Sequence, residues 1–346
     1  MKVLCAMSGG VDSSVAALLL REQGHEVVGV TMKLWGGESD TGCCSVSDVD
    51  DARRVAQQLG LDHLVFNFGE SFNEGVVDPY VADHARGVTP NPCIECNRTV
   101  KFSRLLERSD QLGFDAVATG HHARIGELHG RLTLERGADA AKDQSYVVHM
   151  LDQGALARTM FPIGHMDKSD VRAAATRLGL RTADKPDSQD VCFITSTAGR
   201  STFLGSRIPF HRATVVDTAG AQVGAVESVE MVTIGQRKGL GLPGGGPKRY
   251  VVDVDVAGRR VTVGDGADLV REELVAHSAT WVDGAVEGTV RAQVSAHGDA
   301  CPAEATVEGT TVRLRWEQPQ RRVAPGQSVV LYDAGDGRVL GGGIAT

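Results

Sequence analysis

The sequence predicts an α/β N-terminal domain with a parallel, Rossmann-like sheet, followed by two small all-β barrel domains. Two observations support this fold class. Up to about residue 115, short apolar runs alternate with helix-like segments, as in repeated β-α-β units. After about residue 201, short alternating runs rich in Val, Thr and Gly follow one another between turn residues. We therefore expect domain boundaries that give 1–200, 201–270 and 271–346.

The elements of the first domain follow from its apolar periodicity. Strands are expected at 3–6, 27–32, 63–68 and 116–118, and helices at 15–20, 49–59, 100–112 and 167–178, the last of them ending the helical part. Ligands bind such sheets at the carboxyl ends of the strands. Met32 and Gly120 lie at two of these ends, so both are candidate nucleotide contacts.

The strands of the β domains are expected at shorter intervals. They should lie at 213–216, 250–256, 260–263, 289–294, 312–316 and 329–332. Glycine and proline turns separate them, and a glycine-rich loop at 239–246 falls within the first of the two domains. The length of this part suits two small barrels better than one.

Composition excludes several classes of protein. A net charge of −8 argues against a broadly basic nucleic-acid coat, so RNA would have to bind at local patches such as Lys248-Arg249 or Arg321-Arg322. The sequence has no long apolar run and no secretory leader pattern, so we expect a cytoplasmic protein without a membrane partner. Seven cysteines, an odd number, do not indicate a secreted disulfide framework.

The segment 8–14, Ser-Gly-Gly-Val-Asp-Ser-Ser, lies between the first strand and the first helix. Glycines at a helix start let backbone N–H groups approach an anion, and the hydroxyls of Ser8, Ser13 and Ser14 can add hydrogen bonds to phosphate. The loop lacks the lysine of a Walker A motif. Asp12 would repel a bare phosphate, which suggests a magnesium ion between them. The alternative is an ordinary turn capped by Asp12 or Ser13.

Two cysteine segments carry the second half of the argument. Pro90 and Pro92 should keep Cys96 in a loop just ahead of a helix, where the helix dipole favours a thiolate. The Cys93-x-x-Cys96 spacing is also compatible with zinc, a redox pair or inert core packing, although the chain has no second CxxC. Cys192 lies between a polar turn segment and an apolar strand, where core packing is the simplest role.

The order and spacing of these motifs resemble the tRNA-specific 2-thiouridylases, which belong to the ATP pyrophosphatases of the adenine nucleotide alpha hydrolase type. The resemblance covers the whole chain. Its motifs are AMSGGVDSSV, GCCS, TPNP with CNR and KF, ATGHHAR, KDQSY, DSQDVCFI, TIGQRKGLG, and PGQSVVLYD with LGGG. It implies a sulfurtransferase that uses ATP to replace the oxygen on carbon 2 of the tRNA wobble uridine with sulfur.

The resemblance also implies roles for individual residues. Cys96 would be the catalytic cysteine and Cys192 the persulfide carrier, the two forming a transient disulfide, while Asp12 would hold magnesium through the nucleotide. The expected ATP-binding residues are Ala6, Met7, Ser8, Gly9, Gly10, Val11, Asp12, Ser13, Met32 and Gly120. The expected tRNA-binding residues are Asn91, Pro92, Cys93, His121, Lys142, Asp143, Gln144 and Gln327.

The partners implied by the family are tRNAs for Lys, Glu and Gln and a cysteine desulfurase or sulfur-relay protein, with ATP and Mg²⁺ as cofactors. The chain departs from the family pattern at two places. Cys93 stands where many relatives have Asp, and Ser295-Ala296 stands where many have a basic-aromatic pair.

Two other functions are compatible with parts of the sequence. One is a different adenylating enzyme with the same loop, such as a tRNA lysidine synthetase or an amidotransferase-like synthetase, which would need no thiol. The other is a non-enzymatic RNA-binding protein that uses the barrels alone, which would form no AMP. Activity of cysteine variants and AMP release distinguish the three.

The distance between the two cysteines along the sequence generates a prediction. Cys96 and Cys192 are ninety-six positions apart, and a disulfide requires their Cα atoms to lie within about 7 Å. At least one of the two loops must therefore move. We expect the segment 185–192 to be mobile in the absence of tRNA and to become ordered when tRNA binds. Amide hydrogen exchange should show slower exchange there in the complex. Equal protection with and without tRNA would contradict this expectation.

Overall fold

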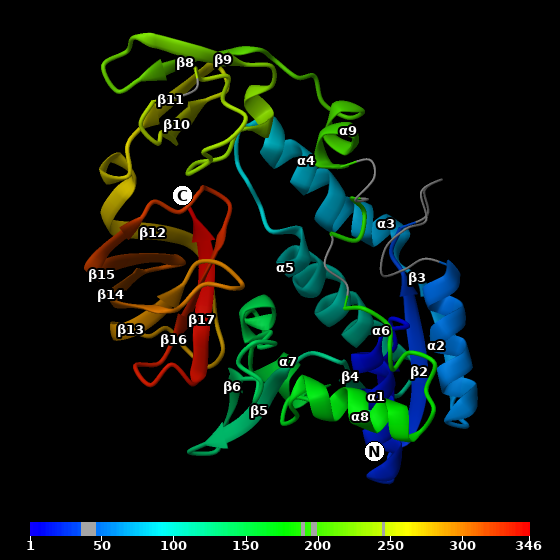
Figure 1. Ribbon diagram of the computed structural model, residues 1–346. Helices are drawn as coiled ribbons and strands as arrows, with labels where there is room; N and C mark the ends of the chain where they lie inside the picture. Colours follow the sequence, from blue (N-terminus) through cyan, green and yellow to red (C-terminus); the bar gives the residue numbers. More distant parts are fainter. Residues whose placement is uncertain (36–45, 188–190, 195–198, 244–245) are drawn as a thin grey trace.

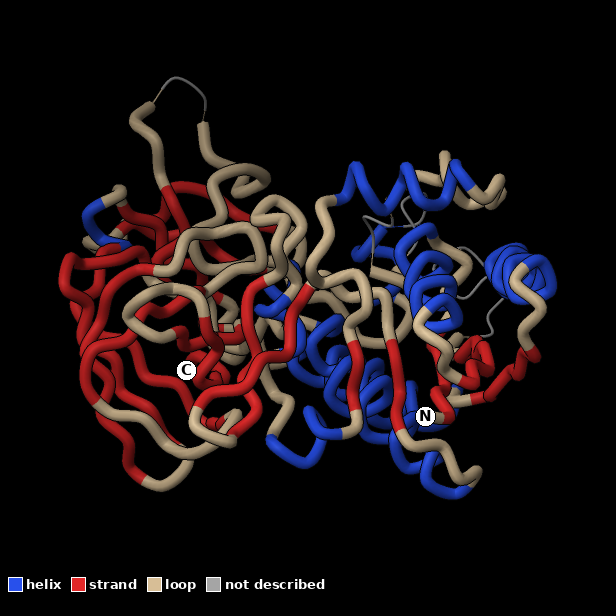
Figure 2. The backbone as a smooth tube through the Cα atoms, turned by 90° about the horizontal axis from the view of Figure 1, so that it is seen from below, coloured by secondary structure: helices blue, strands red, loops and turns tan. Residues whose placement is uncertain are grey.

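The computed structural model describes residues 1–35, 46–187, 191–194, 199–243 and 246–346. Most helices gather in one half of the molecule and most strands in the other (Figures 1 and 2). The predicted fold class is therefore confirmed. None of the helices in these described parts is long and apolar enough to cross a membrane.

The N-terminal sheet has five strands in the order β3-β2-β1-β4-β7, all of them parallel. Their bounds are β1 Lys2–Ala6, β2 Glu26–Lys33, β3 Asp62–Asn67, β4 Ala116–Ala118 and β7 Thr159–Met160. The four predicted strands are confirmed. Only β7 was not predicted, because a strand of two residues has no periodicity to detect.

Helices cover both faces of this sheet. Alternate residues of β1 point to opposite faces, and each set is buried in its own core. Val3 and Cys5 pack in a core with the three helices of one face, and Leu4 and Ala6 pack in a second core with the helix of the other. The helices of the first face are α1 Val11–Glu22, α2 Val46–Gln58 and α8 Lys168–Arg177, and that of the second is α6 Leu105–Gln111.

The other helices are shorter than α1, α2 and α8. In chain order they are α3 Gly69–Phe72, the π-helical η1 Asn73–Val77, α4 Asp78–Ala85, α5 Pro92–Cys96, the π-helical η2 Asn97–Arg104, the 3₁₀ turn η3 Ser145–Val148, α7 Gln153–Ala157 and α9 Gly199–Gly205. Of these, α3 and α4 follow one another toward the central β strands, and α7 lies beside the strand β6 Arg131–Arg136 (Figure 1). The expectation that residues 167–178 form the last helix is wrong, because α9 follows; its seven residues are too few for a clear helical period.

The central region forms a four-stranded sheet in the order β10-β11-β8-β9. Its elements are β8 Ala213–Asp217, β9 Gln222–Val226, the 3₁₀ turn η4 Val229–Met231, β10 Tyr250–Asp255, β11 Arg260–Gly264 and the 3₁₀ turn η5 Ala267–Leu269. The core between them consists mainly of valines, including Val215, Val251 and Val261, which are fully buried. The three strands expected here are confirmed.

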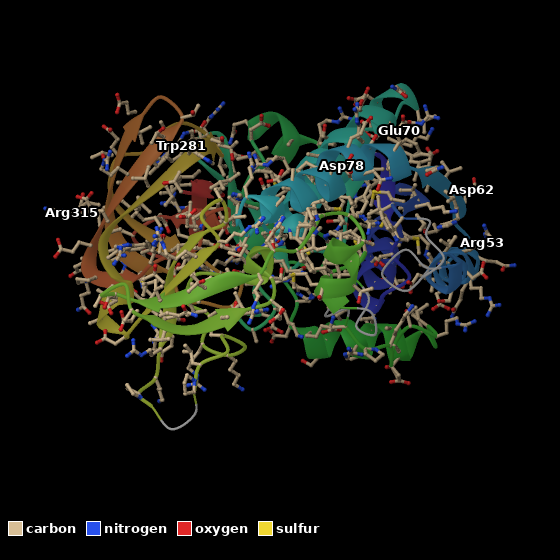
Figure 3. The ribbon with its side chains drawn as sticks, turned by 90° about the horizontal axis from the view of Figure 1, so that it is seen from above. Arg53, Asp62, Glu70, Asp78, Trp281 and Arg315 are labelled. Atoms are coloured by element: carbon tan, nitrogen blue, oxygen red, sulfur yellow. The ribbon has the colours of Figure 1, made fainter. Side chains whose placement is uncertain are left out.

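The C-terminal region forms an eight-stranded sheet in the order β12-β15-β14-β13-β16-β17-β6-β5, and a further β12–β17 pairing closes its first six strands into a barrel. The strands are β5 Ala123–Leu128, β6 Arg131–Arg136, β12 Val270–Trp281, β13 Gly288–Gln293, β14 Cys301–Glu308, β15 Thr311–Arg321, β16 Ser328–Tyr332 and β17 Arg338–Ala345. In Figure 3, Trp281 and Arg315 mark the barrel at one end of the molecule, and Arg53 and Asp62 mark the other end.

The hairpin β5–β6 was not predicted, and it joins the two halves of the chain. His129 and Gly130 between its strands both have positive φ, 52° and 77°, as a tight two-residue hairpin turn requires. The hairpin adds to the barrel through β6, where Leu134 pairs with Val339 of β17. A segment from the first part of the sequence therefore completes the C-terminal sheet.

Polar contacts buried behind this hairpin hold the two halves together. The Arg136 guanidinium lies 3.7 Å from the ring centre of Tyr332 and pairs with Asp143 and Asp336, each at 2.7 Å. The hydroxyl of Tyr146 donates a hydrogen bond of 2.8 Å to the Ser328 carbonyl. Residues of the hairpin and of the short helices near it thus share one hydrophobic core with the barrel.

We expect Tyr146→Phe to lower the free energy of unfolding by about 1 kcal/mol, because it removes a buried hydrogen bond between the two halves. Thermal or denaturant unfolding measures the change. Tyr250→Phe is the matched control, because the described structure gives its hydroxyl no hydrogen-bond partner. Equal effects of the two substitutions would contradict the role of Tyr146.

Candidate active site

The loop between β1 and α1 presents the amino end of a helix that no side chain caps. Gly10 is the N-cap of α1 and provides no side-chain hydrogen bond to the first turn. Ser13 closes the loop on itself, because its hydroxyl accepts from the Ser8 amide at 3.2 Å and donates to the Gly10 carbonyl at 3.1 Å. Such an uncapped helix end, following a parallel strand, is suited to an anion.

Two glycines allow backbone segments to meet at this loop. Gly9 has φ of +72°, and a Cβ there would collide with the carbonyl of Asp48 at the start of α2. Gly120 follows β4, and a Cβ there would lie 2.6 Å from the Ser13 amide nitrogen. The close approach expected at Gly120 is therefore, in the structure, an approach to the first turn of α1.

Asp12 lies in the first turn of α1 among cationic and polar groups. Lys168 Nζ lies 2.7 Å from both of its carboxylate oxygens, and His122 Nε2 lies 3.4 Å from one of them. Burial alone would raise the pKa of Asp12, but hydrogen bonds from His122 and Lys168 outweigh it and lower the pKa. No cluster of three metal-ligating side chains exists within the described residues.

Two further candidate contacts, Ser14 and Met32, are at least partly buried. The Ser14 hydroxyl is fully buried, where it donates to the Gly10 carbonyl at 2.8 Å and meets the Thr182 hydroxyl at 3.2 Å. The expectation that it faces a phosphate is therefore wrong, because it points into the core. Met32, at the end of β2, is half-buried beside Phe68.

Cys96 is the last residue of α5, and the expectation that it lies in a loop ahead of a helix is wrong. Pro92 occupies the first turn of α5, where proline costs no hydrogen bond. Asn91 caps the helix, its side-chain oxygen accepting from the amides of Cys93 and Ile94 at 3.1 and 3.4 Å. Cys93, exposed in the first turn, thus has the helix-end position expected for Cys96, which is buried.

Cys96 and Cys192 pack in the same hydrophobic cluster. Phe72, Tyr80 and Phe193 form part of its core, with ring centres of Tyr80 and Phe193 5.4 Å apart. Residues 191–194 form a turn rather than the expected strand, because the Ile194 amide bonds the Val191 carbonyl at 2.9 Å. Residues 36–45, which include Cys43 and Cys44, and residues 188–190 lie outside the described part of the chain.

His121 and the 142–144 run lie beside the loop with different surroundings. His121 packs between Phe102 and Phe161, and burial lowers its pKa to about 3, so the ring is neutral. Asp143 is held by Arg136, and the Gln144 side chain accepts from the His122 amide at 2.9 Å. The side chain of Lys142 is more exposed than that of Asp143.

Gln327 lies on the barrel but contacts the segment that precedes α5. Its side-chain amide donates a hydrogen bond to the Thr89 carbonyl. The Thr89 amide in turn donates to the Pro325 carbonyl at 2.9 Å. A turn of the barrel thus fixes the chain just before Asn91, the cap of the helix that ends at Cys96.

Sequence reasoning missed several residues that surround the loop. Lys168 makes an ion pair with Asp12 and another with Asp187. Lys185 makes an ion pair with Asp48. No periodicity distinguishes these residues from surface charges. The one available signal was the Lys-Pro-Asp run before the Cys192 motif, which contains Lys185 and Asp187 but not Lys168.

These features define an α/β protein in which an uncapped helix end, suited to an anion, follows the first strand of a parallel sheet. Residues 1–196 match the family described as tRNA methyl transferase HUP domain. Residues 201–265 match the tRNA methyl transferase PRC-barrel domain, and residues 271–345 match the aminomethyltransferase beta-barrel domain.

Curated relatives resemble the chain along its full length. A protein from Symbiobacterium thermophilum named tRNA-specific 2-thiouridylase MnmA is 47% identical, over 99% of this chain and 91% of its own. A protein of the same name from Mycobacterium ulcerans is 48% identical, over 100% of this chain and 98% of its own. The chain belongs to the family of tRNA-specific 2-thiouridylases, which are tRNA-modifying sulfurtransferases.

We expect Gly120→Ala to lower the free energy of unfolding by about 1–3 kcal/mol, because the new methyl group collides with backbone atoms of Ser13 and Asp12. Gly284→Ala is the matched control, since nothing lies within 4 Å of a Cβ at that position. Denaturant unfolding measures both variants. A Gly120→Ala protein as stable as the control would show that the loop accommodates the methyl group.

Proposed function

We propose that the protein catalyses ATP-dependent 2-thiolation of the wobble uridine of tRNA. In this reaction the carbon-2 oxygen is adenylated, and sulfur from a cysteine persulfide replaces it with release of AMP and pyrophosphate. The observation that carries the proposal is the packing of Cys96 and Cys192 in one cluster, in a chain of the thiouridylase family. Sulfur transfer between two thiols requires that they share one site.

The loop between β1 and α1 is proposed to bind ATP. Its uncapped amides and the Ser8 hydroxyl suit phosphate oxygens, which supports contacts from residues 6–13, with Met32 and Gly120 nearby. Because the described side chains offer no protein-only metal cluster, Mg²⁺ would be held mainly by phosphates, with Asp12 as its protein ligand. When bound, Mg²⁺ would neutralise the charge of the departing pyrophosphate.

The chemistry explains why the loop and the cysteines belong together. A uridine carbonyl oxygen is a poor leaving group, and its adenylation converts it into AMP, a good one. The outer sulfur of a persulfide on Cys192 then attacks carbon 2, either directly or after release as hydrosulfide. The Cys96 thiolate attacks the inner sulfur and forms the Cys96–Cys192 disulfide, so the sulfur–sulfur bond of the persulfide breaks as this one forms. Cellular thiols must reduce the disulfide afterwards.

The tRNA is proposed to approach from the side of α5. Asn91 caps that helix, and Pro92 and the exposed Cys93 begin it, so an extruded anticodon base would lie near Cys96. Contacts to the rest of the tRNA are proposed for His121, Lys142, Asp143, Gln144 and Gln327. Of these, Gln327 also holds the segment before Asn91 in place.

The proposed partners follow from this reaction. tRNAs for Lys, Glu and Gln would supply the wobble uridine, and a cysteine desulfurase or relay protein would load Cys192. The anticodon loop is single-stranded, so moving a base out of it costs less than in a duplex. The proposed location is the cytoplasm, where tRNA and reducing thiols are both present.

We expect 2-thiouridine to form when the protein is incubated with unmodified tRNA, ATP, Mg²⁺ and a cysteine desulfurase with cysteine as the donor of persulfide sulfur, and mass analysis of tRNA nucleosides measures it. Cys96→Ser and Cys192→Ser should each abolish thiolation by the persulfide route, whereas Cys301→Ser, in the barrel, should not. Full activity in both variants would favour a different adenylating enzyme. An absence of AMP formation would favour an RNA-binding protein.

We expect Lys142→Glu to weaken tRNA binding and to reduce the slope of log affinity against log salt by about one, because one phosphate contact is lost. Filter binding at several salt concentrations measures the slope. Lys142 is partly exposed and pairs with Asp187 at 2.8 Å, so its ammonium is already held in place. An unchanged slope would remove Lys142 from the proposed tRNA contacts.

A further inference from the structure

The segment that leads toward Cys192 folds back onto the loop between β1 and α1. The Thr182 hydroxyl donates to the Ser14 hydroxyl at 3.2 Å, and Lys185 Nζ donates to the Gly9 carbonyl at 3.0 Å. The segment therefore contacts the loop on both sides of Asp12. No part of the proposed reaction requires these contacts.

Lys185 also connects this segment to α2. Its ammonium lies 2.6 Å from Asp48 Oδ1 and 2.9 Å from Asp51 Oδ2. Burial alone would lower the pKa of Lys185, but the hydrogen bonds that its ammonium donates to these two carboxylates raise it. The segment is thus fixed by charge at a second helix that borders the loop.

Asp187, at the end of the segment, is surrounded by cations. Its carboxylate lies 2.8 Å from Lys142 Nζ, 2.9 Å from Lys168 Nζ and 3.0 Å from Arg172 Nη2. Burial alone would raise its pKa, but hydrogen bonds from Lys142 and Lys168 lower the pKa to about 2. The carboxylate therefore stays ionised at any physiological pH, and its ion pairs persist.

Lys168 is shared between two carboxylates with different roles. Its ammonium lies 2.7 Å from both oxygens of Asp12 and 2.9 Å from Asp187, and its side chain is only 10% exposed. A buried ammonium held by two carboxylates redistributes its hydrogen bonds when the charge at either one changes. The nucleotide loop and the chain leading to Cys192 are therefore connected through one side chain.

We propose that Asp187 is a positioning residue that couples nucleotide binding at the loop to the environment of Cys192. Phosphates bound with Mg²⁺ at Asp12 would compete with Asp12 for Lys168, and Lys168 would then change its contact with Asp187. Asp187 lies five positions before Cys192 in the sequence, so we expect this change to alter the environment of the sulfur carrier. This inference rests on the proposed function, and it adds that nucleotide occupancy controls the access of reagents to the Cys192 thiol.

The reactivity of Cys192 tests the coupling without requiring thiolation. The full-length protein is treated with iodoacetamide, with and without Mg²⁺ and a non-hydrolysable ATP analogue, and peptide mass spectrometry follows alkylation of Cys192. In the unmodified protein, the analogue should change the alkylation rate at least about threefold. In Asp187→Asn, which keeps the shape of the side chain but loses its charge, the analogue should change the rate by less than about 1.3-fold.

Asp184→Asn is the matched control, because Asp184 lies on the same segment, is exposed, and has no ion pair in the described structure. It should keep the full response to the analogue. Asp187→Glu, which restores the charge, should recover at least part of the response. It replaces Asp187→Asn if thermal unfolding shows the Asn variant to be misfolded. An Asp187→Glu protein with no response to the analogue would then overturn the inference.

The outcomes separate this inference from the proposed function. If the unmodified protein does not bind the analogue, as measured by calorimetry, the proposed function fails. If it binds but the alkylation rate of Cys192 is unchanged, or if Asp187→Asn responds like the unmodified protein, the coupling is wrong and the proposed function stands. Loss of analogue binding in Asp187→Asn would also overturn it, because Asp187 would then belong to the nucleotide site itself.

Discussion

The ion pair between Lys168 and Asp12 is the interaction on which the candidate site depends. Asp12 lies in the first turn of a helix, where a negative charge is favoured by the dipole, and a cation from another helix holds it there. The contact fixes α8 against the start of α1. Without it, the Asp12 carboxylate would keep only the longer contact with His122, and its charge would oppose the binding of an anion at the loop.

The second organising feature is the fixed chain before α5. Thr89 is held by the barrel on both its amide and its carbonyl, and Asn91 then starts the helix that ends at Cys96. The position of the buried cysteine is thus set partly by the C-terminal barrel. The barrel therefore shapes the site directly, besides any contact that it makes with RNA.

The sequence predicted the parts of the structure that local patterns determine. Apolar runs located the four longer strands of the first sheet, and the Gly9-Gly10 pair located the helix start. The hairpin β5–β6 was missed although His129-Gly130 was a usable turn signal, because its partner strand lies far along the chain. The error at Cys96 came from treating Pro92 as a helix breaker, whereas a first-turn proline is tolerated. Contacts such as Lys168 with Asp187 depend on tertiary placement and leave no pattern in the sequence.

The pairing of β6 with β17 has a consequence for the order of folding during synthesis. Arg136 and its partner Asp336 are 200 positions apart, so the hairpin emerges from the ribosome long before the strand that receives it. At the synthesis rates of cells, about 5–20 residues per second, the part of the hairpin that faces the barrel waits uncovered for on the order of ten seconds or more. Leu134, fully buried in the finished protein, is a surface that chaperones would meet during this interval.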